Sequence, residues 1–152
     1  MIIFQSYNYS PSLKSNNNEK KSSVQEQTYI PDDNFEAALI SYGYDDVLDD
    51  YVITSNISSL KSLKLNDRQI LDPTGIQDFI ELTDLSFTNN LLTSLDISNN
   101  KALKNLEIND NFLTSIDVSN NTELILFSLY NNNIKSLDLT ENLKLQTLSV
   151  YK

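Results

Sequence analysis

The second half of the chain is organised by apolar residues that return at a fixed spacing. From Leu82 onward each apolar position recurs 21 residues later, and a looser copy begins at Leu60, one residue further away. Three such columns are Leu82, Leu103, Leu124 and Leu145; Leu85, Leu106, Phe127 and Leu148; and Phe87, Ile108, Leu129 and Val150. This period predicts a solenoid, because one coil cannot bury its own apolar face and must stack on its neighbours.

Each copy has the order L-x-x-L-x-L-x-x-N-x-L, which is the leucine-rich-repeat signature. Its alternating apolar residues predict a short strand that points every second side chain inward. The Asn that follows the strand is expected to satisfy backbone groups at a bend that no strand ladder reaches. This column consists of Asn90, Asn111 and Asn132.

The return half of each coil has a similar template, for example Thr93-Ser-Leu-Asp-Ile-Ser-Asn-Asn, and ends at Asn100, Asn121 or Asn142. Two near-equivalent halves of about 10 residues leave no room for a helix on the return side. The sequence therefore predicts a mostly β leucine-rich-repeat solenoid with a short N-terminal helical cap. It should contain about 4.5 coils, each with two short strands in parallel ladders.

Three segments follow from this pattern. Residues 1–27 are polar and aperiodic, which predicts a disordered segment, because little apolar surface offsets the entropy of ordering. Residues 28–59 are expected to form the helical cap, and residues 60–152 form the repeats, with an incomplete last coil.

The cap is predicted to contain one helix over residues 31–43. Asp33 and Glu36 have the spacing of a capping box at its start. Phe35, Leu39 and Tyr42 recur at the spacing of one helix face and predict the stripe that docks on the repeats.

The nested 21-residue pattern resembles the short bacterial leucine-rich repeats of the IRREKO type, found in secreted and surface proteins of Bacteroidetes. The segment Tyr29-Ile-Pro-Asp-Asp-Asn-Phe-Glu-Ala-Ala-Leu-Ile and the segment Asp72-Pro-Thr-Gly-Ile-Gln-Asp-Phe resemble the N-terminal cap of those proteins. The resemblance implies a secreted or cell-surface location, although no signal peptide follows Met1; a cytoplasmic location is the alternative.

The composition disfavours several classes of function. The chain has 11 Lys and Arg against 21 Asp and Glu, a formal net charge of -10, which disfavours nucleic acid and anionic membrane surfaces. It contains no Cys and no His, and only two Gly, so thiolate, imidazole and phosphate-loop chemistry lack candidate residues. No apolar run approaches the ~20 residues of a membrane-spanning helix. We therefore expect a protein that is not an enzyme, uses no cofactor and does not insert into a membrane.

The outward positions of the first strand in each coil are the leading binding candidates, because they vary while the inward positions do not. They are Asp84, Ser86, Thr88, Asn105, Glu107, Asn109, Leu126, Ser128, Tyr130, Thr147, Ser149 and Tyr151. Among these we select Thr88, Asn109, Leu126, Tyr130 and Tyr151, since two stacked tyrosines beside an exposed Leu are typical of an interface. The alternative is that Tyr is simply a favourable strand residue.

A column of carboxylates is the second candidate. Asp96, Asp117 and Asp138 lie in equivalent return positions, flanked by Ser and Thr. Calcium would relieve their repulsion, but Ca²⁺ takes about 6–8 oxygen ligands and a flat ladder offers few. The alternative is that each Asp caps backbone or hydroxyl groups. The acidic run over residues 45–50 lacks the order of an EF-hand loop and is expected to be a solvated turn.

These features favour a recognition module that binds a protein or a glycan on an exposed sheet face. The alternatives are a structural spacer or adhesin segment, or the targeting arm of a larger surface protein or enzyme. The incomplete last coil shows apolar residues and an unpaired strand edge to water. We therefore expect either that the chain is a fragment of a longer repeat protein, or that this end pairs with another copy in an end-to-end assembly.

Overall fold

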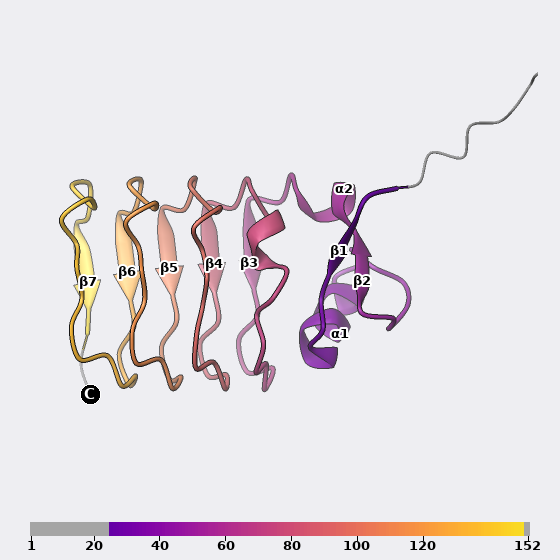
Figure 1. Ribbon diagram of the computed structural model, residues 1–152, viewed down its shortest axis with the longest axis horizontal. Coiled ribbons are helices and arrows are strands. Elements are labelled where there is room, and N and C mark those ends of the chain that lie inside the picture. Colours follow the sequence, from indigo (N-terminus) through magenta and orange to yellow (C-terminus); the bar gives the residue numbers. More distant parts are fainter. Residues whose placement is uncertain (1–24, 151–152) are drawn as a thin grey trace, which may run out of the picture.

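The computed structural model describes residues 25–150 as a cap followed by a solenoid (Figure 1). The cap contains β1 (Gln27–Tyr29), α1 (Asp33–Ser41), β2 (Tyr51–Ile53) and α2 (Thr54–Ile57). The solenoid contains β3 (Ser62–Lys64), the 3-10 helix η1 (Ile76–Asp78), β4 (Asp84–Ser86), β5 (Asn105–Glu107), β6 (Leu126–Ser128) and β7 (Thr147–Ser149). Most of the segment predicted to be disordered lies outside the described residues, as does Tyr151.

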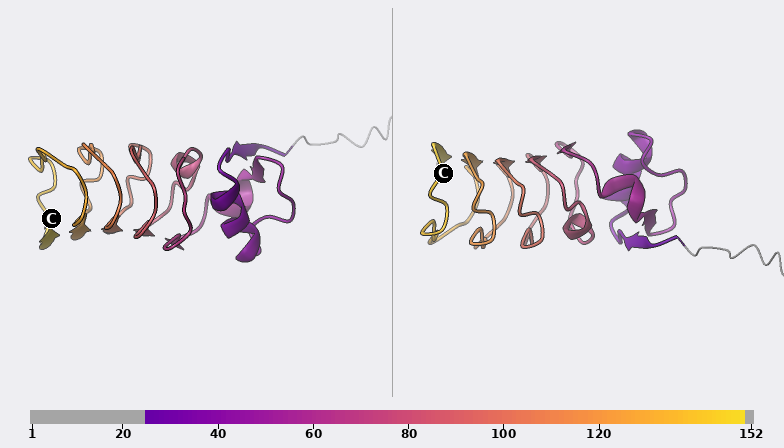
Figure 2. Two further views of the ribbon diagram at one scale, coloured as in Figure 1. Left: turned by 90° about the horizontal axis from the view of Figure 1, so that it is seen from below. Right: turned by 90° about the horizontal axis from the view of Figure 1, so that it is seen from above.

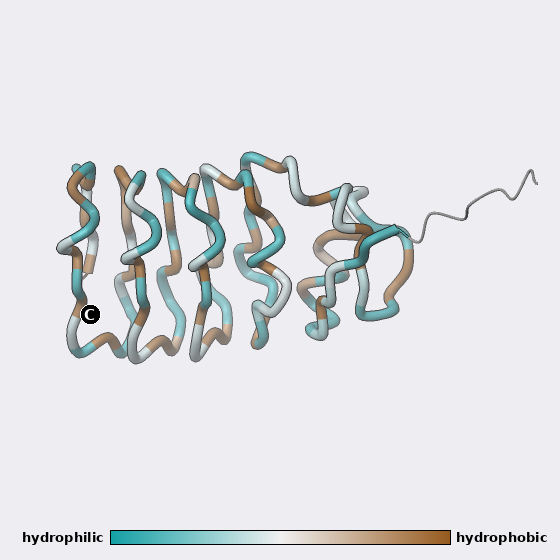
Figure 3. The backbone as a smooth tube through the Cα atoms, turned by 45° about the horizontal axis from the view of Figure 1, so that its top comes forward, coloured by the Kyte–Doolittle hydropathy of each residue, from teal (hydrophilic) through white to brown (hydrophobic). Residues whose placement is uncertain are grey.

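Strands β3 to β7 form a five-stranded parallel sheet in chain order, one strand to a coil. The register keeps the apolar columns together, with Leu63 opposite Leu85, Leu85 opposite Leu106, and Leu106 opposite Phe127. Figure 2 shows the strands along one side of the solenoid and the return segments along the other. Apolar residues recur at the same place in successive coils (Figure 3). The predicted leucine-rich-repeat solenoid is confirmed.

The return half of each coil corrects the prediction of two strands per coil. Among residues 25–150 it forms no ladder and is irregular backbone, except in the first coil, where the 3-10 helix η1 lies on the return side that the sequence predicted to have no room for a helix. Asp96, Asp117 and Asp138 each accept a hydrogen bond from the N–H two residues further on, at 2.9–3.0 Å. This local bond occupies an N–H that a ladder would need, so the backbone turns instead of pairing.

Both Asn columns are buried and bond to backbone groups, as predicted. Asn111 accepts from the Leu92 N–H at 3.0 Å and donates to the Phe87 carbonyl at 2.9 Å. On the return side, Asn121 donates to the Asn100 carbonyl of the preceding coil at 2.9 Å. Each side chain therefore ties its own turn to the turn before it, in a region that water does not reach.

The start of α1 differs from the predicted capping box. Asp32, not Asp33, is the N-cap residue, and its Oδ1 accepts from the N–H groups of Asn34 and Phe35 at 3.0 Å. Its Oδ2 accepts from the Leu71 N–H at 2.7 Å. One carboxylate therefore caps the helix and ties it to a turn of the first coil. A spacing rule within the helix could not show this second role.

Glu36, the other half of the predicted capping box, is fully buried and points away from the helix start. Its Oε1 accepts from the N–H groups of Asp49 and Tyr51 at 2.9 and 3.1 Å, and its Oε2 accepts from Asp50 at 3.1 Å. The loop between α1 and β2 is thus organised around one buried carboxylate. This bonding replaces the N-terminal role that the sequence predicted for Glu36.

The helix docks on the repeats through aromatic rings. Phe35 lies 6.0 Å from both Phe79 and Phe87, stacked on the first and edge-on to the second. Leu39 is buried, as the predicted stripe requires, but Tyr42 is 41% exposed. The third residue of the predicted stripe therefore lies partly at the surface and not in the core.

Gly75 provides a close contact between the cap and the first coil. Its φ is +99°, and a Cβ there would lie 2.6 Å from the Tyr29 carbonyl oxygen and 2.3 Å from Ile30 Cδ1. We expect Gly75→Ala to destabilise the fold by roughly 1–3 kcal/mol through strain and overpacking. Gly43→Ala is the control, because φ is +77° but no atom lies within 4 Å. Urea denaturation of both variants checks this; an equal loss would mean that the contact at Gly75 is unimportant.

Candidate interaction surfaces

The outer face of the sheet is hollowed across β3 to β6. The hollow has a volume of about 350 Å³ and crosses four strands. Its lining consists of Ser62, Leu63, Lys64, Asp84, Leu85, Ser86, Asn105, Glu107 and Leu126. Lys64 and Glu107 are exposed, while Leu126 is half-buried. The face therefore combines both charges with one accessible aliphatic side chain.

Hydrogen bonds across neighbouring strands hold the polar side chains of this hollow. Asp84 accepts from Asn105 Nδ2 at 2.6 Å and from Thr83 Oγ1 at 2.6 Å. Ser86 Oγ donates to Asn66 Oδ1 at 2.6 Å. Side chains fixed in this way lose little rotamer freedom when a partner binds.

The structure describes four of the five predicted binding residues, and Tyr151 lies outside the part of the chain that it describes. Leu126 lines the hollow, whereas Thr88 and Tyr130 are half-buried beyond the strand ends. Asn109 is only 4% exposed and accepts from Ser128 Oγ at 2.7 Å and from the Tyr130 N–H at 3.2 Å. Asn109 therefore links two neighbouring coils through these hydrogen bonds. This finding corrects its predicted role as an exposed contact.

The burial of Asn109 affects the loss of stability that we expect for two Asn variants. We expect Asn111→Ala to cost roughly 2–3 kcal/mol, because it leaves several buried backbone groups unpaired. Asn109→Ala should cost less, about 1–2 kcal/mol, because its partners are only partly buried and water can replace the amide. Denaturant midpoints of the two variants decide the order. If Asn109→Ala lowers stability more than Asn111→Ala, the buried Asn column at the turn does not contribute more to stability than Asn109.

The predicted carboxylate column is present on the return side, but its members bond to their own turns. Hydrogen bonds from the backbone and side chain of Ser98 lower the pKa of Asp96, and those of Ser119 lower the pKa of Asp117. Thr140 has the same effect on the pKa of Asp138. In the part of the chain that the structure describes, no group of three or more His, Cys, Asp or Glu side chains is arranged to hold a metal ion.

The lowered pKa values predict an acid-dependent contribution to stability. A carboxyl with a lower pKa in the folded state stabilises the fold above its unfolded pKa of ~3.9, and this is lost as pH falls through the folded pKa. Replacing Asp96, Asp117 and Asp138 together by Asn should therefore lower the melting temperature more at pH 7 than at pH 3. Thermal melts at both pH values measure this. A deficit that does not change with pH would contradict it.

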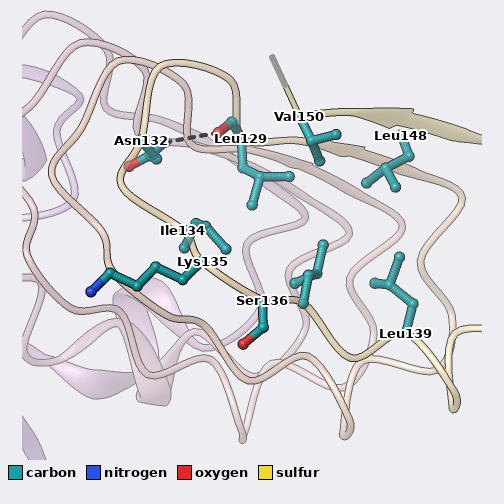
Figure 4. A pocket seen from close by; sticks show the side chains of 9 residues that line it. Leu129, Asn132, Ile134, Lys135, Ser136, Leu139, Leu148 and Val150 are labelled. Carbon is teal, nitrogen blue, oxygen red and sulfur yellow. Dashed lines mark hydrogen bonds between the residues drawn. The ribbon is translucent and has the colours of Figure 1, made fainter. Parts of the chain in front are cut away.

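At the C-terminal end of the described solenoid, the last coil carries an apolar cavity of about 350 Å³ (Figure 4). Its lining consists of Leu129, Asn132, Ile134, Lys135, Ser136, Leu137, Leu139, Leu148 and Val150. Leu148 and Val150 are 41% and 51% exposed. Strand β7 pairs on one side with β6 and is the last strand of the described sheet. This end presents both apolar surface and a strand edge.

The loop over residues 43–50 is a third surface feature. It exposes Val47 and Leu48 between pairs of Asp residues, beside a hollow of about 290 Å³. Partial burial raises the pKa of the Asp45 carboxyl. Glu36 accepts hydrogen bonds from backbone N–H groups of this loop, so the conformation of the loop is fixed.

Comparisons with known proteins agree with this architecture. No known protein-family profile matches the chain. Internalin J of Listeria monocytogenes is 35% identical over 72 residues, which are 47% of this chain and 8% of that protein. The solved functional domain of internalin J superposes with a TM-score of 0.72 and 30% identity, over 82% of this chain and 30% of that one.

A leucine-rich-repeat protein of Leptospira interrogans shares the fold with a TM-score of 0.60 and 24% identity, over 62% of this chain and 26% of that chain. The chain thus spans less than a third of the length of these relatives. The class is nevertheless defined: the protein is a leucine-rich-repeat solenoid whose relatives are bacterial leucine-rich-repeat proteins. None of these relatives is named for a catalytic activity. Within residues 25–150 no helix is long and apolar enough to cross a membrane.

Proposed function

We propose that this chain is a non-catalytic recognition module that binds a partner protein on the outer face of β3 to β6. The observation that supports this most directly is the hollow across four strands, lined by fixed polar side chains around Leu126. Interfaces draw most of their affinity from a few anchors in a surrounding polar rim. Leu126 is the apolar anchor, and Lys64, Asp84 and Glu107 form the rim.

The experiment is to pan a random dodecapeptide display library against the immobilised chain. Selected peptides should lose binding to Glu107→Arg and Leu126→Arg but keep binding to Thr114→Arg and Thr122→Arg. All four positions are at least partly accessible, and the last two lie on the turn and return side. Peptides that bind all four variants equally would remove the sheet face from the proposal.

Two other results would change the proposed function. Binding of glycans, but of no peptide, on the same face would replace the protein partner by a glycan. A folded chain that binds neither would favour the spacer or targeting-arm role.

We further propose a second contact at the apolar end beside β7, where a copy of the chain can cover Leu148 and Val150 and pair with the strand edge. Light scattering over a concentration series should show mass increasing with concentration, and Val150→Lys should suppress the increase. A monomer at all concentrations would contradict this contact.

The repeat subtype and the location belong to the same proposal. The nested 21-residue template supports an IRREKO-type repeat, and resemblance to that repeat type favours a surface or secreted protein. Labelling intact and permeabilised cells with an antibody to the repeats tests the location. Signal only after permeabilisation would contradict it.

A further inference from the structure

Two tyrosines of the cap form a second hollow beside the first. Tyr42 and Tyr44 follow α1 and, together with Ser62, Leu63 and Lys64 of β3, line a hollow of about 250 Å³. Their ring centroids lie 6.0 Å apart and their planes are inclined by 56°. The rings therefore form an open angle at the junction between the cap and the first strand of the sheet.

The Tyr42 side chain and the Tyr44 backbone are held in place before any partner arrives. Tyr42 Oη donates to the Lys64 carbonyl at 2.5 Å, and Arg68 lies over the Tyr42 ring at 5.6 Å. The Tyr44 N–H donates to the Leu39 carbonyl at 3.0 Å, and its own carbonyl accepts from Asn56 Nδ2 at 3.0 Å. Fixed aromatic rings bind with little loss of conformational freedom.

The tyrosine hollow adjoins the hollow of the sheet face. Ser62, Leu63 and Lys64 line both, so the two meet across β3. The two adjoining hollows, together called the groove below, extend from the cap to β6. A chain segment lying in it would cross the sheet in the direction of the solenoid axis.

Positive and negative side chains lie in different parts of this groove. Lys64 and Arg68 lie next to the tyrosines, so a cation between the rings would be repelled. Asp84 and Glu107 lie further along, on β4 and β5. The groove therefore favours an uncharged apolar group at the rings and a cation over the sheet.

We propose that the groove takes a proline-containing, extended segment of the partner protein, with the proline against Tyr42 and Tyr44 and a Lys or Arg over Asp84 and Glu107. Aromatic-lined grooves suit polyproline II segments, whose preformed conformation reduces the entropy lost on binding. This inference rests on the proposed role of the sheet face in binding protein.

The spacing of the two groups follows from the geometry. Strand β5 is two ladder steps from β3, or roughly 10 Å at ~4.8 Å a step. A polyproline II segment rises about 3.1 Å per residue. Because the rings lie on the cap side of β3, the basic residue should stand three or more residues from the proline.

The test uses a labelled peptide, Ala-Pro-Ala-Pro-Pro-Ala-Ala-Arg-Ala, and the full chain in a fluorescence-anisotropy titration. We expect saturable binding that weakens about tenfold or more for Tyr42→Ala and for Glu107→Lys. Tyr29→Ala is the matched control, since Tyr29 is also an exposed tyrosine of the cap but packs on Tyr51 outside the groove. It should bind the peptide as the unmodified chain does.

Two peptide variants test the idea without changing the protein. Replacing the prolines by Ala, or the Arg by Glu, should each weaken binding about tenfold. Absence of binding at ~1 mM peptide, or binding that ignores these peptide changes or Tyr42→Ala, would overturn the inference. Library peptides that depend on Glu107 and Leu126 but not on Tyr42 would also overturn it, while the proposed function of the sheet face would stand.

Discussion

Glu36→Ala should destabilise the fold by about 3–5 kcal/mol, the largest effect we expect from any single polar residue. The side chain is fully buried and accepts three backbone hydrogen bonds from Asp49, Asp50 and Tyr51. Bonds to a charged acceptor contribute about 1.5–3 kcal/mol each, and they do not add fully. Its loss frees the loop between α1 and β2 and leaves buried N–H groups without an acceptor.

Urea denaturation followed by circular dichroism measures this change. Asp33→Ala is the control, because it removes the same charge from an exposed position three residues earlier on the same helix. It should cost under about 1 kcal/mol. Glu36→Gln should fall between the two, since an amide retains one acceptor oxygen. Equal losses for Glu36→Ala and Asp33→Ala would show that the buried carboxylate does not organise the loop.

Leu106→Ala should cost about 2–5 kcal/mol, as a large-to-small change in a packed core. Leu106 is fully buried in the middle strand of the sheet, with Leu85 and Phe127 opposite it in the neighbouring strands. A void there cannot be filled by either neighbour, because the ladder on both sides fixes their backbones.

Glu107→Ala is the control for that variant. Glu107 follows directly in the sequence but points outward and is exposed, so its loss should cost under about 0.5 kcal/mol. Thermal and urea unfolding of both variants provide the comparison. Similar losses would mean that the inward and outward positions of β5 have been assigned wrongly.

The repeat columns could be predicted from the sequence because each rests on one short-range rule. Inward residues such as Leu85 and Leu106 alternate with polar ones, and the 21-residue period then dictates which strands are neighbours. The second strand of each coil could not be excluded in this way. Asp96 competes for the backbone N–H of Ser98, and a hydrophobic pattern does not register that competition.

The candidate site was less predictable, because it depends on contacts between distant segments. Asn109 stands at an outward strand position, yet its amide lies under the next coil. Tyr42 has the spacing of a buried helix face, yet its phenol reaches the carbonyl of Lys64 in β3. Neither contact has a signal within about ten residues of sequence. The outward alternation did place Leu126 on the face where the structure has it.

The most direct test of the sheet face as a protein-binding surface is an NMR titration of the ¹⁵N-labelled chain with a library-selected peptide. Amide shifts should concentrate at outward positions of β3 to β6, with those of Lys64, Glu107 and Leu126 among the largest. Residues of the return side, such as Asp96 and Asp117, should stay unchanged. Shifts confined to the return side or to the apolar end beside β7 would contradict it.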